Sequence, residues 1–169
     1  PQLRLLARNC QKRLFIGIAG ELLLKAVYLH AGFCINKPAD PNGTSLKLPF
    51  TPAQWQSSGE LLSEDESFTL GQVIDHIKDV VPLGGDQAAV LEGLNVAKVY
   101  RNKEGHIVAR KHDYLPSDYR KIESALTLLY RHSFDEVLEL HFSIAANEKA
   151  VFRISPAPRG FPEMRPRTA

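Results

Sequence analysis

The chain has 169 residues, of which 44% are hydrophobic and 24% are charged. This length and composition predict one globular domain with a sizeable core, and they exclude a chain that is disordered throughout. The longest apolar stretch, residues 14–33, is interrupted by Glu21, Lys25 and His30. A membrane-spanning helix needs about 20 mostly apolar residues, so we expect neither a membrane span nor a membrane partner.

The two cysteines favour a reducing environment. Cys10 and Cys34 lie in or just after one predicted helix, where their side chains cannot reach each other. Free thiols are typical of the cytosol, and no small-residue cleavage site of a secretory signal follows the apolar stretch. We therefore expect a cytoplasmic protein.

The net charge of +2 hides a strong segregation along the chain. Residues 1–13 carry four basic residues and no acid, residues 60–92 carry eight acids against one lysine, and residues 101–121 carry six basic residues and three acids. Basic segments of this kind permit contact with nucleic acid. Ordinary solvated faces produce the same segregation, so charge alone does not decide between the two.

Helical periodicity dominates the first 134 residues. We predict a first helix over residues 3–30, with Gly32 as its stop. Its apolar stripe comprises Leu6, Leu14, Phe15, Ile18, Ala19, Leu22, Leu23, Ala26 and Leu29.

Residues 33–66 contain four prolines and two glycines and are predicted to form a long connection. A short helix is expected inside it, with Thr51 as N-cap, Pro52 at the first position and Gln54 completing a capping box. Trp55 would pack this turn onto the body of the domain.

Three further helices are predicted, one after Thr69 with Gln72 completing a capping box, one after Asp86, and one near Ser117. Their apolar positions are Val73, Ile74, Ile77, Val80 and Val81 in the first, Val90, Leu91, Leu94, Ala97 and Lys98 in the second, and Tyr119, Ile122, Ala125, Leu126, Leu129 and Tyr130 in the third.

The last part of the chain changes period. Alternating apolar residues over 136–155 predict a β-hairpin, and residues 156–169, with four prolines and three arginines, predict a flexible basic tail. The expected fold is therefore mainly α. It is an antiparallel bundle of four to five helices over residues 3–134, joined by the hairpin into a single domain over residues 1–155.

The segment Arg101-Asn102-Lys103-Glu104-Gly105-His106 carries the most chemistry. Asn102 and His106 are four residues apart and would be neighbours on a helix. An arginine can hold a phosphate bidentately, and a histidine can move a proton near neutral pH. A plain polar turn at a helix end is the alternative interpretation.

This R-N-x-x-x-H motif, the upstream run F-I-G-I-A-G-E-L-L-L-K-A and the order of helices together resemble the HEPN superfamily over roughly residues 4–134. The resemblance implies a helical bundle that works as a homodimer and cleaves RNA without a metal, leaving a 2′,3′-cyclic phosphate. It implies that His106 acts as general base or acid, that Arg101 stabilises charge on the phosphorane, and that Asn102 orients His106 or a phosphate oxygen. Toxin–antitoxin, phage-defence and RNA-processing roles are typical of the family.

Two features depart from the family pattern. Members paired with a nucleotidyltransferase antitoxin often carry a tyrosine two residues after the histidine, where this chain has Val108. The predicted hairpin lies outside the minimal bundle, and it would extend the dimer interface or connect to another domain.

Weaker candidates surround the motif. Lys103, Arg110 and Lys111 are candidate RNA contacts or a solvated face. Glu21 is a candidate partner of Arg101, although the favoured interpretation is a surface pair with Lys25. We expect no cofactor and no metal, because His30 and Cys34 supply only two ligands.

Three functions remain open from the sequence. The leading one is a HEPN-type endoribonuclease acting on RNA, with an antitoxin or another partner protein. The second is a catalytically silent module that binds nucleotides or RNA through Arg101. The third is a helical dimerisation or interaction domain of a larger protein.

Overall fold

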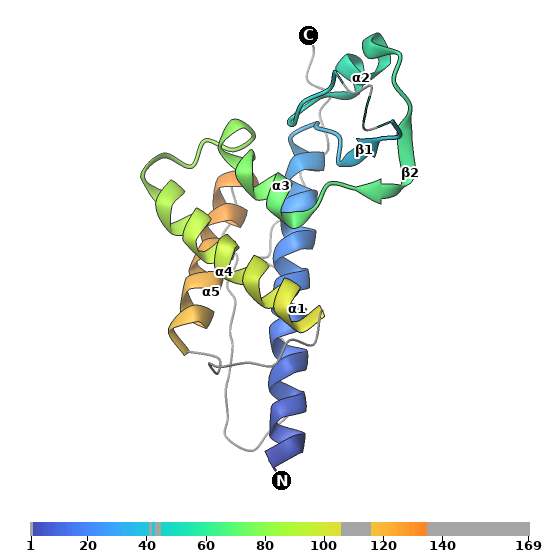
Figure 1. Cartoon of the computed structure of the whole chain (residues 1–169). Helices are drawn as coiled ribbons and strands as arrows, with labels where there is room; N and C mark the ends of the chain where they lie inside the picture. The colour runs from blue at the N-terminus through green and yellow to red at the C-terminus, as the bar shows by residue number, and fades with distance from the viewer. Residues whose placement is uncertain (1, 41, 43–44, 106–115, 135–169) are drawn as a thin grey trace, which may run out of the picture.

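The computed structural model describes residues 2–40, 42, 45–105 and 116–134, and this part of the chain is mainly helical, as predicted (Figure 1). The predicted hairpin over 136–155 and the tail over 156–169 lie outside the described residues. The elements are α1 (Gln2–His30), β1 (Asn36–Pro38), α2 (Pro52–Ser58), β2 (Leu62–Ser67), α3 (Leu70–Asp75), two short 3-10 turns (Ile77–Asp79 and Gly84–Asp86), α4 (Gln87–Gly105) and α5 (Pro116–Phe134).

The helix α4 is the centre of the bundle, packing against both α1 and α5, while the short α3 lies across α1 and α4 (Figure 1). Close approach at two glycines makes this possible. A Cβ atom placed on Gly93 would overlap the carbonyl oxygen of Lys121 and the methyl group of Ala125 on α5. A Cβ atom on Gly17 would lie 2.5 Å from the Cβ of Arg101, so α1 and α4 almost touch there.

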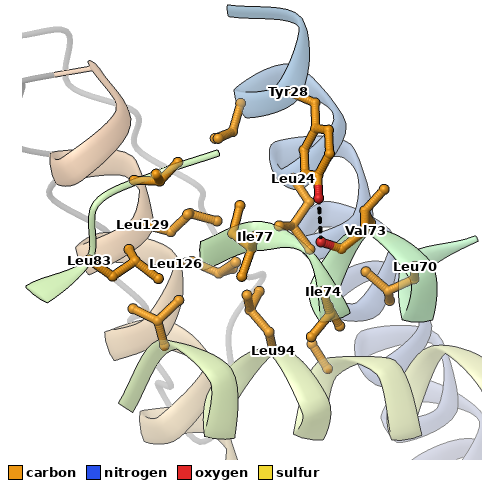
Figure 2. Close-up of a cluster of buried hydrophobic side chains, with 14 of the residues drawn as sticks. Leu24, Tyr28, Leu70, Val73, Ile74, Ile77, Leu83, Leu94, Leu126 and Leu129 are labelled. Atoms are coloured by element: carbon orange, nitrogen blue, oxygen red, sulfur yellow. Dashed lines mark hydrogen bonds between the residues drawn. The ribbon is translucent and has the colours of Figure 1, made fainter. Parts of the chain in front are cut away.

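The hydrophobic core lies where α1, α3, α4 and α5 meet (Figure 2). The apolar positions predicted for α5 are largely confirmed, because Ile122, Ala125, Leu126 and Leu129 are buried. Tyr28 of α1 is fully buried, and its hydroxyl donates a 2.8 Å hydrogen bond to the carbonyl oxygen of Val73. This bond satisfies the one polar atom that Tyr28 brings into the core, and burial raises the pKa of that hydroxyl.

Both capping boxes are confirmed. The Thr51 hydroxyl accepts from the Gln54 amide while the Gln54 side chain accepts from the Thr51 amide. Thr69 and Gln72 repeat this exchange at the start of α3. Trp55 packs against the edge of the core as expected. These ends are well predicted because a capping box is local in sequence.

The helix after Thr69 is shorter than its apolar pattern predicts. It ends at Asp75, and the chain continues through His76 into the 3-10 turn Ile77–Asp79. Ile77 and Val81 are nevertheless buried. Their burial therefore reports contact with the core and not continuation of the helix.

Residues 33–66 were predicted to be a long connection, but β1 and β2, which ends at Ser67, form a small antiparallel sheet there in addition to the short helix α2. Asn36 of β1 pairs with Ser67 of β2, and Pro38 pairs with Leu62. The Phe68 amide donates to the Ile35 carbonyl, which carries the pairing up to the core. The strand β2 leads directly into α3, and its last residue, Ser67, lies beside α1.

Much of the apolar stripe predicted for the first helix lies away from the core, although Leu23 packs against it. Phe15, Ile18, Leu22 and Leu29 are 64%, 37%, 62% and 56% exposed. The face that enters the core carries Gly17, Gly20, Leu24, Val27 and Tyr28 instead. The helix α1 therefore has two apolar faces, and within the described residues only one is covered. No helix in the described part of the chain is long and apolar enough to cross a membrane.

Candidate functional site

Arg101 lies near the end of α4, at the point where this helix crosses α1. It follows Leu94 and Ala97 on the core-facing side of α4, directly after Tyr100, the last buried core residue of this helix among those described. Because Gly17 has no side chain, the backbone of Arg101 reaches α1 and its guanidinium extends along that helix. The side chain is 45% exposed and can reach solvent.

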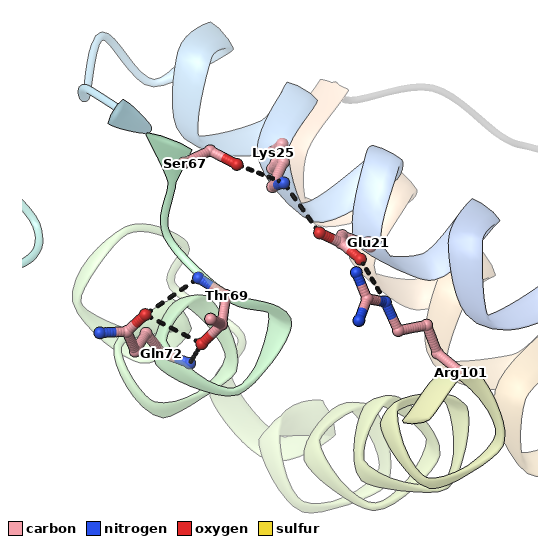
Figure 3. A network of polar contacts seen from close by, with 6 residues as sticks. All are labelled: Glu21, Lys25, Ser67, Thr69, Gln72 and Arg101. Carbon is pink, nitrogen blue, oxygen red and sulfur yellow. Dashed lines mark hydrogen bonds and ion pairs between the residues drawn. The ribbon is translucent and has the colours of Figure 1, made fainter. Parts of the chain in front are cut away.

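Glu21 on α1 holds the guanidinium. The Arg101 Nε donates a 2.9 Å hydrogen bond to Glu21 Oε2, and Lys25 Nζ donates a 2.8 Å bond to Glu21 Oε1 (Figure 3). The same ammonium bonds the Ser67 hydroxyl at 2.7 Å, which ties β2 into the network. The two pairings considered for Glu21 therefore both occur, and this carboxylate connects α1 to α4 and, through Lys25, to the sheet.

Electrostatics keep Glu21 ionised. Its partial burial raises the pKa of this carboxyl, but Lys25 and Arg101 outweigh that effect, so its pKa lies below the ordinary value. With the carboxylate charged, the Nε edge of Arg101 is fixed. The Nη groups carry the remaining N–H donors and bind no described side chain.

Arg101 lines a hollow of about 400 Å³ between α3 and the end of α4. Arg101 and Asn102 line it from α4, as does Lys98 one turn earlier. The first turn of α3 and Asp75 at its end form the opposite wall. The structure thus brings Arg101 and Asn102 of the motif to one hollow.

Lys98 is the member of this group that sequence reasoning missed. It was assigned to the apolar stripe of its helix, whereas the structure places it half-buried with its ammonium against Gly71 of α3. A usable signal was present, because Lys98, Arg101 and Asn102 have the i, i+3, i+4 spacing of one helix face.

The other predicted basic residues do not line this hollow in the described part of the chain. His106, Arg110 and Lys111 lie outside the described residues, and Lys103 is described only in its backbone. Arg13, from the basic start of the chain, is buried and does not contribute to a basic surface. Among the described residues, no three His, Cys, Asp or Glu side chains converge as metal ligands would.

Comparison of the chain with protein-family models, curated proteins and solved structures finds no match. We therefore infer a function from the residues that line the hollow. Two cations on one helix face, one of them held by a partly buried carboxylate, form an arrangement suited to binding the oxygen atoms of an anion.

Proposed function

We propose that this chain is a metal-independent endoribonuclease of the HEPN type, active as a homodimer in an RNA-processing, toxin or defence role. The observation that carries the proposal is the pairing of Arg101 with Glu21. An arginine held through Nε presents its Nη groups to a ligand in a fixed orientation, and such pre-organisation is what stabilises charge in a transition state.

The proposed reaction is an internal transfer at one phosphodiester. The RNA 2′-oxygen forms a bond to phosphorus and loses its proton to a base, while the bond from phosphorus to the 5′-oxygen breaks and that oxygen takes up a proton. His106 supplies the base, and His106 of the second copy supplies the acid. Arg101 stabilises the phosphorane oxygen atoms, and Asn102 orients the phosphate. No metal is needed for any step.

The outer face of α1 supports the dimer. Phe15, Leu22 and Leu29 are each seven residues apart, which is the spacing of a helix–helix seam, and all three are more than half exposed. Ala19 and Ala26 lie beside them and are also exposed, so a second helix can approach closely. Lys25, at the edge of this face, is already neutralised by Glu21.

A second copy of this chain is the occupant we propose for that face. The same stripe on both copies is self-complementary, as a two-fold interface requires. The exposed parts of its four large side chains, with Ile18 included, amount to roughly 400 Å² per copy, the size of the largest apolar patch on a typical monomer, which is often functional. A stable dimer buries about 800 Å² on each partner, so flanking residues must contribute the rest.

RNA cleavage in excess EDTA tests the proposal. The wild-type protein should produce 2′,3′-cyclic phosphate ends, and both Arg101→Ala and His106→Ala should reduce the rate at least about 100-fold. Arg131→Ala, a change at an exposed arginine on α5, is the matched control and should retain full activity. Cleavage that both site variants retain would refute the assignment, whereas RNA binding without any cleavage would favour the catalytically silent module.

A further inference from the structure

We infer that the hollow between α3 and α4 is a phosphate-binding subsite for a ribonucleotide, in which Lys98 is the second cation beside Arg101. The inference rests on the proposed function for its choice of substrate. Lys98 lies outside the R-N-x-x-x-H motif, and its role can be tested by binding measurements alone.

The position of Lys98 is set by a glycine. A Cβ atom placed on Gly71 would lie 2.9 Å from the Lys98 Nζ and 3.2 Å from its Cε. The ammonium therefore lies directly against the backbone of α3, where any larger residue would displace it. Its long stem is half-buried between the two helices, which limits the orientations open to the charge.

Lys98 is a cation that the fold leaves available. No carboxylate among the described residues forms an ion pair with it, in contrast to Lys25, Lys37 and Lys121. Asp75 lines the far part of the same hollow without pairing with Lys98 or Arg101. An anion would therefore bind at the α4 side, between the two cations and away from Asp75.

The size of the hollow fits the proposed ligand. Its volume of about 400 Å³ falls in the range of small-molecule sites, so it can hold one nucleotide with its phosphate. Lys98 and Arg101 are three residues apart on one helix and so present two cations on the same face. Asn102 adds an amide that can donate to the same phosphate.

Binding of two probes tests the subsite. Adenosine 3′-monophosphate reports a free nucleotide, and a 2′-O-methyl RNA 12-mer, which lacks the attacking hydroxyl, reports an RNA strand. Lys98→Gln should weaken binding of at least one probe about tenfold, and for the strand it should lower the slope of log affinity against log salt by about 0.7. Lys78→Gln, which removes an exposed lysine elsewhere, should change neither quantity.

Gly71→Ala separates the position of the ammonium from a loss of folding. It should weaken binding when Lys98 is present and have no effect in the Lys98→Gln background, since the displaced group is then absent. The subsite would be overturned if Gly71→Ala weakened binding equally in the wild-type and Lys98→Gln proteins. It would also be overturned if Lys98→Gln bound both probes as tightly as the control Lys78→Gln.

These results are independent of cleavage. If the wild-type protein cleaves RNA but Lys98→Gln does not change binding, the subsite is refuted and the nuclease assignment is retained. If binding depends on Lys98 but the protein never cleaves RNA, the subsite is supported and the nuclease assignment is refuted.

Discussion

Arg101 Nε and Glu21 Oε2 are 2.9 Å apart although 80 residues separate them along the chain. The contact joins the last turns of α4 to the middle of α1, about one helical turn from the Gly17 crossing. Because Glu21 is only 12% exposed while Arg101 is 45% exposed, the carboxylate is the fixed partner and the guanidinium is the part that meets solvent. Pre-organisation of the candidate site therefore depends on α1.

Glu21→Gln tests this dependence. The substitution keeps the shape but removes the charge, leaving Lys25 and Arg101 without their shared anion. We expect a loss of about 1 kcal/mol in unfolding free energy, since the bonds are charge-assisted but partly exposed, together with weaker RNA binding. Urea unfolding and RNA titration measure the two effects. Glu92→Gln, which breaks the exposed pair with Lys121, should shift stability by less than about 0.5 kcal/mol.

The depressed pKa of Glu21 predicts how that loss varies with pH. A carboxyl whose pKa is lower in the folded than in the unfolded protein stabilises the fold above its unfolded pKa, and this contribution disappears as pH falls through the folded pKa. The stability difference between the wild type and Glu21→Gln should therefore be present at neutral pH and shrink as the carboxyl protonates in acid. A difference that stays constant down to the acid limit of the folded state would contradict the charged network.

Two glycines of α1 provide a matched pair of substitutions. Gly17→Ala places a methyl group 2.5 Å from the Arg101 Cβ, so α4 must move away, and we expect a loss of about 2 kcal/mol. Gly20→Ala meets Ala97 at 3.5 Å, an ordinary contact, and should be neutral or stabilise the helix by up to about 1 kcal/mol. Denaturant unfolding of both variants gives the comparison, and equal effects would refute the close crossing at Gly17.

Leu22→Lys tests the proposed dimer face. Leu22 is 62% exposed in the middle of the outer stripe of α1, so the change should leave the monomer folded but break the homodimer. Light scattering after size exclusion should give about twice the 18.9 kDa chain mass for the wild type and the single mass for the variant. Leu61→Lys alters a leucine that is 75% exposed elsewhere and should remain dimeric. A wild-type monomer at high concentration would exclude a second copy as the occupant.

The sequence predicted those parts of the fold that depend on local chemistry. The capping boxes at Thr51 and Thr69 and the stop at Gly32, which adopts a φ of 83°, are confirmed because each involves neighbouring residues. The sheet was missed because β1 has three residues, including a proline, and because β2 reads L-S-E-D-E-S, which has no apolar alternation.

Apolar periodicity did not identify the core-facing side of α1, for a different reason. This helix is apolar on two sides, and periodicity alone does not tell which side faces the core of its own chain. The inner side is rich in small residues such as Gly17 and Gly20, which weigh little in a hydrophobic pattern but permit close packing. Glu21 was already a candidate partner of Arg101 from the sequence. The contact itself, like the position of the Lys98 ammonium against Gly71, depends on the placement of α1 and α3 beside α4.

Cleavage of an oligonucleotide with a single ribonucleotide in an otherwise deoxyribose strand tests the central claim most directly. In excess EDTA, the wild-type protein should cut only at that ribonucleotide and leave a 2′,3′-cyclic phosphate, and Arg101→Ala should not. Cutting at deoxyribose positions, cutting that requires a metal, or a 3′-hydroxyl product would contradict attack by the 2′-oxygen at the Arg101 site.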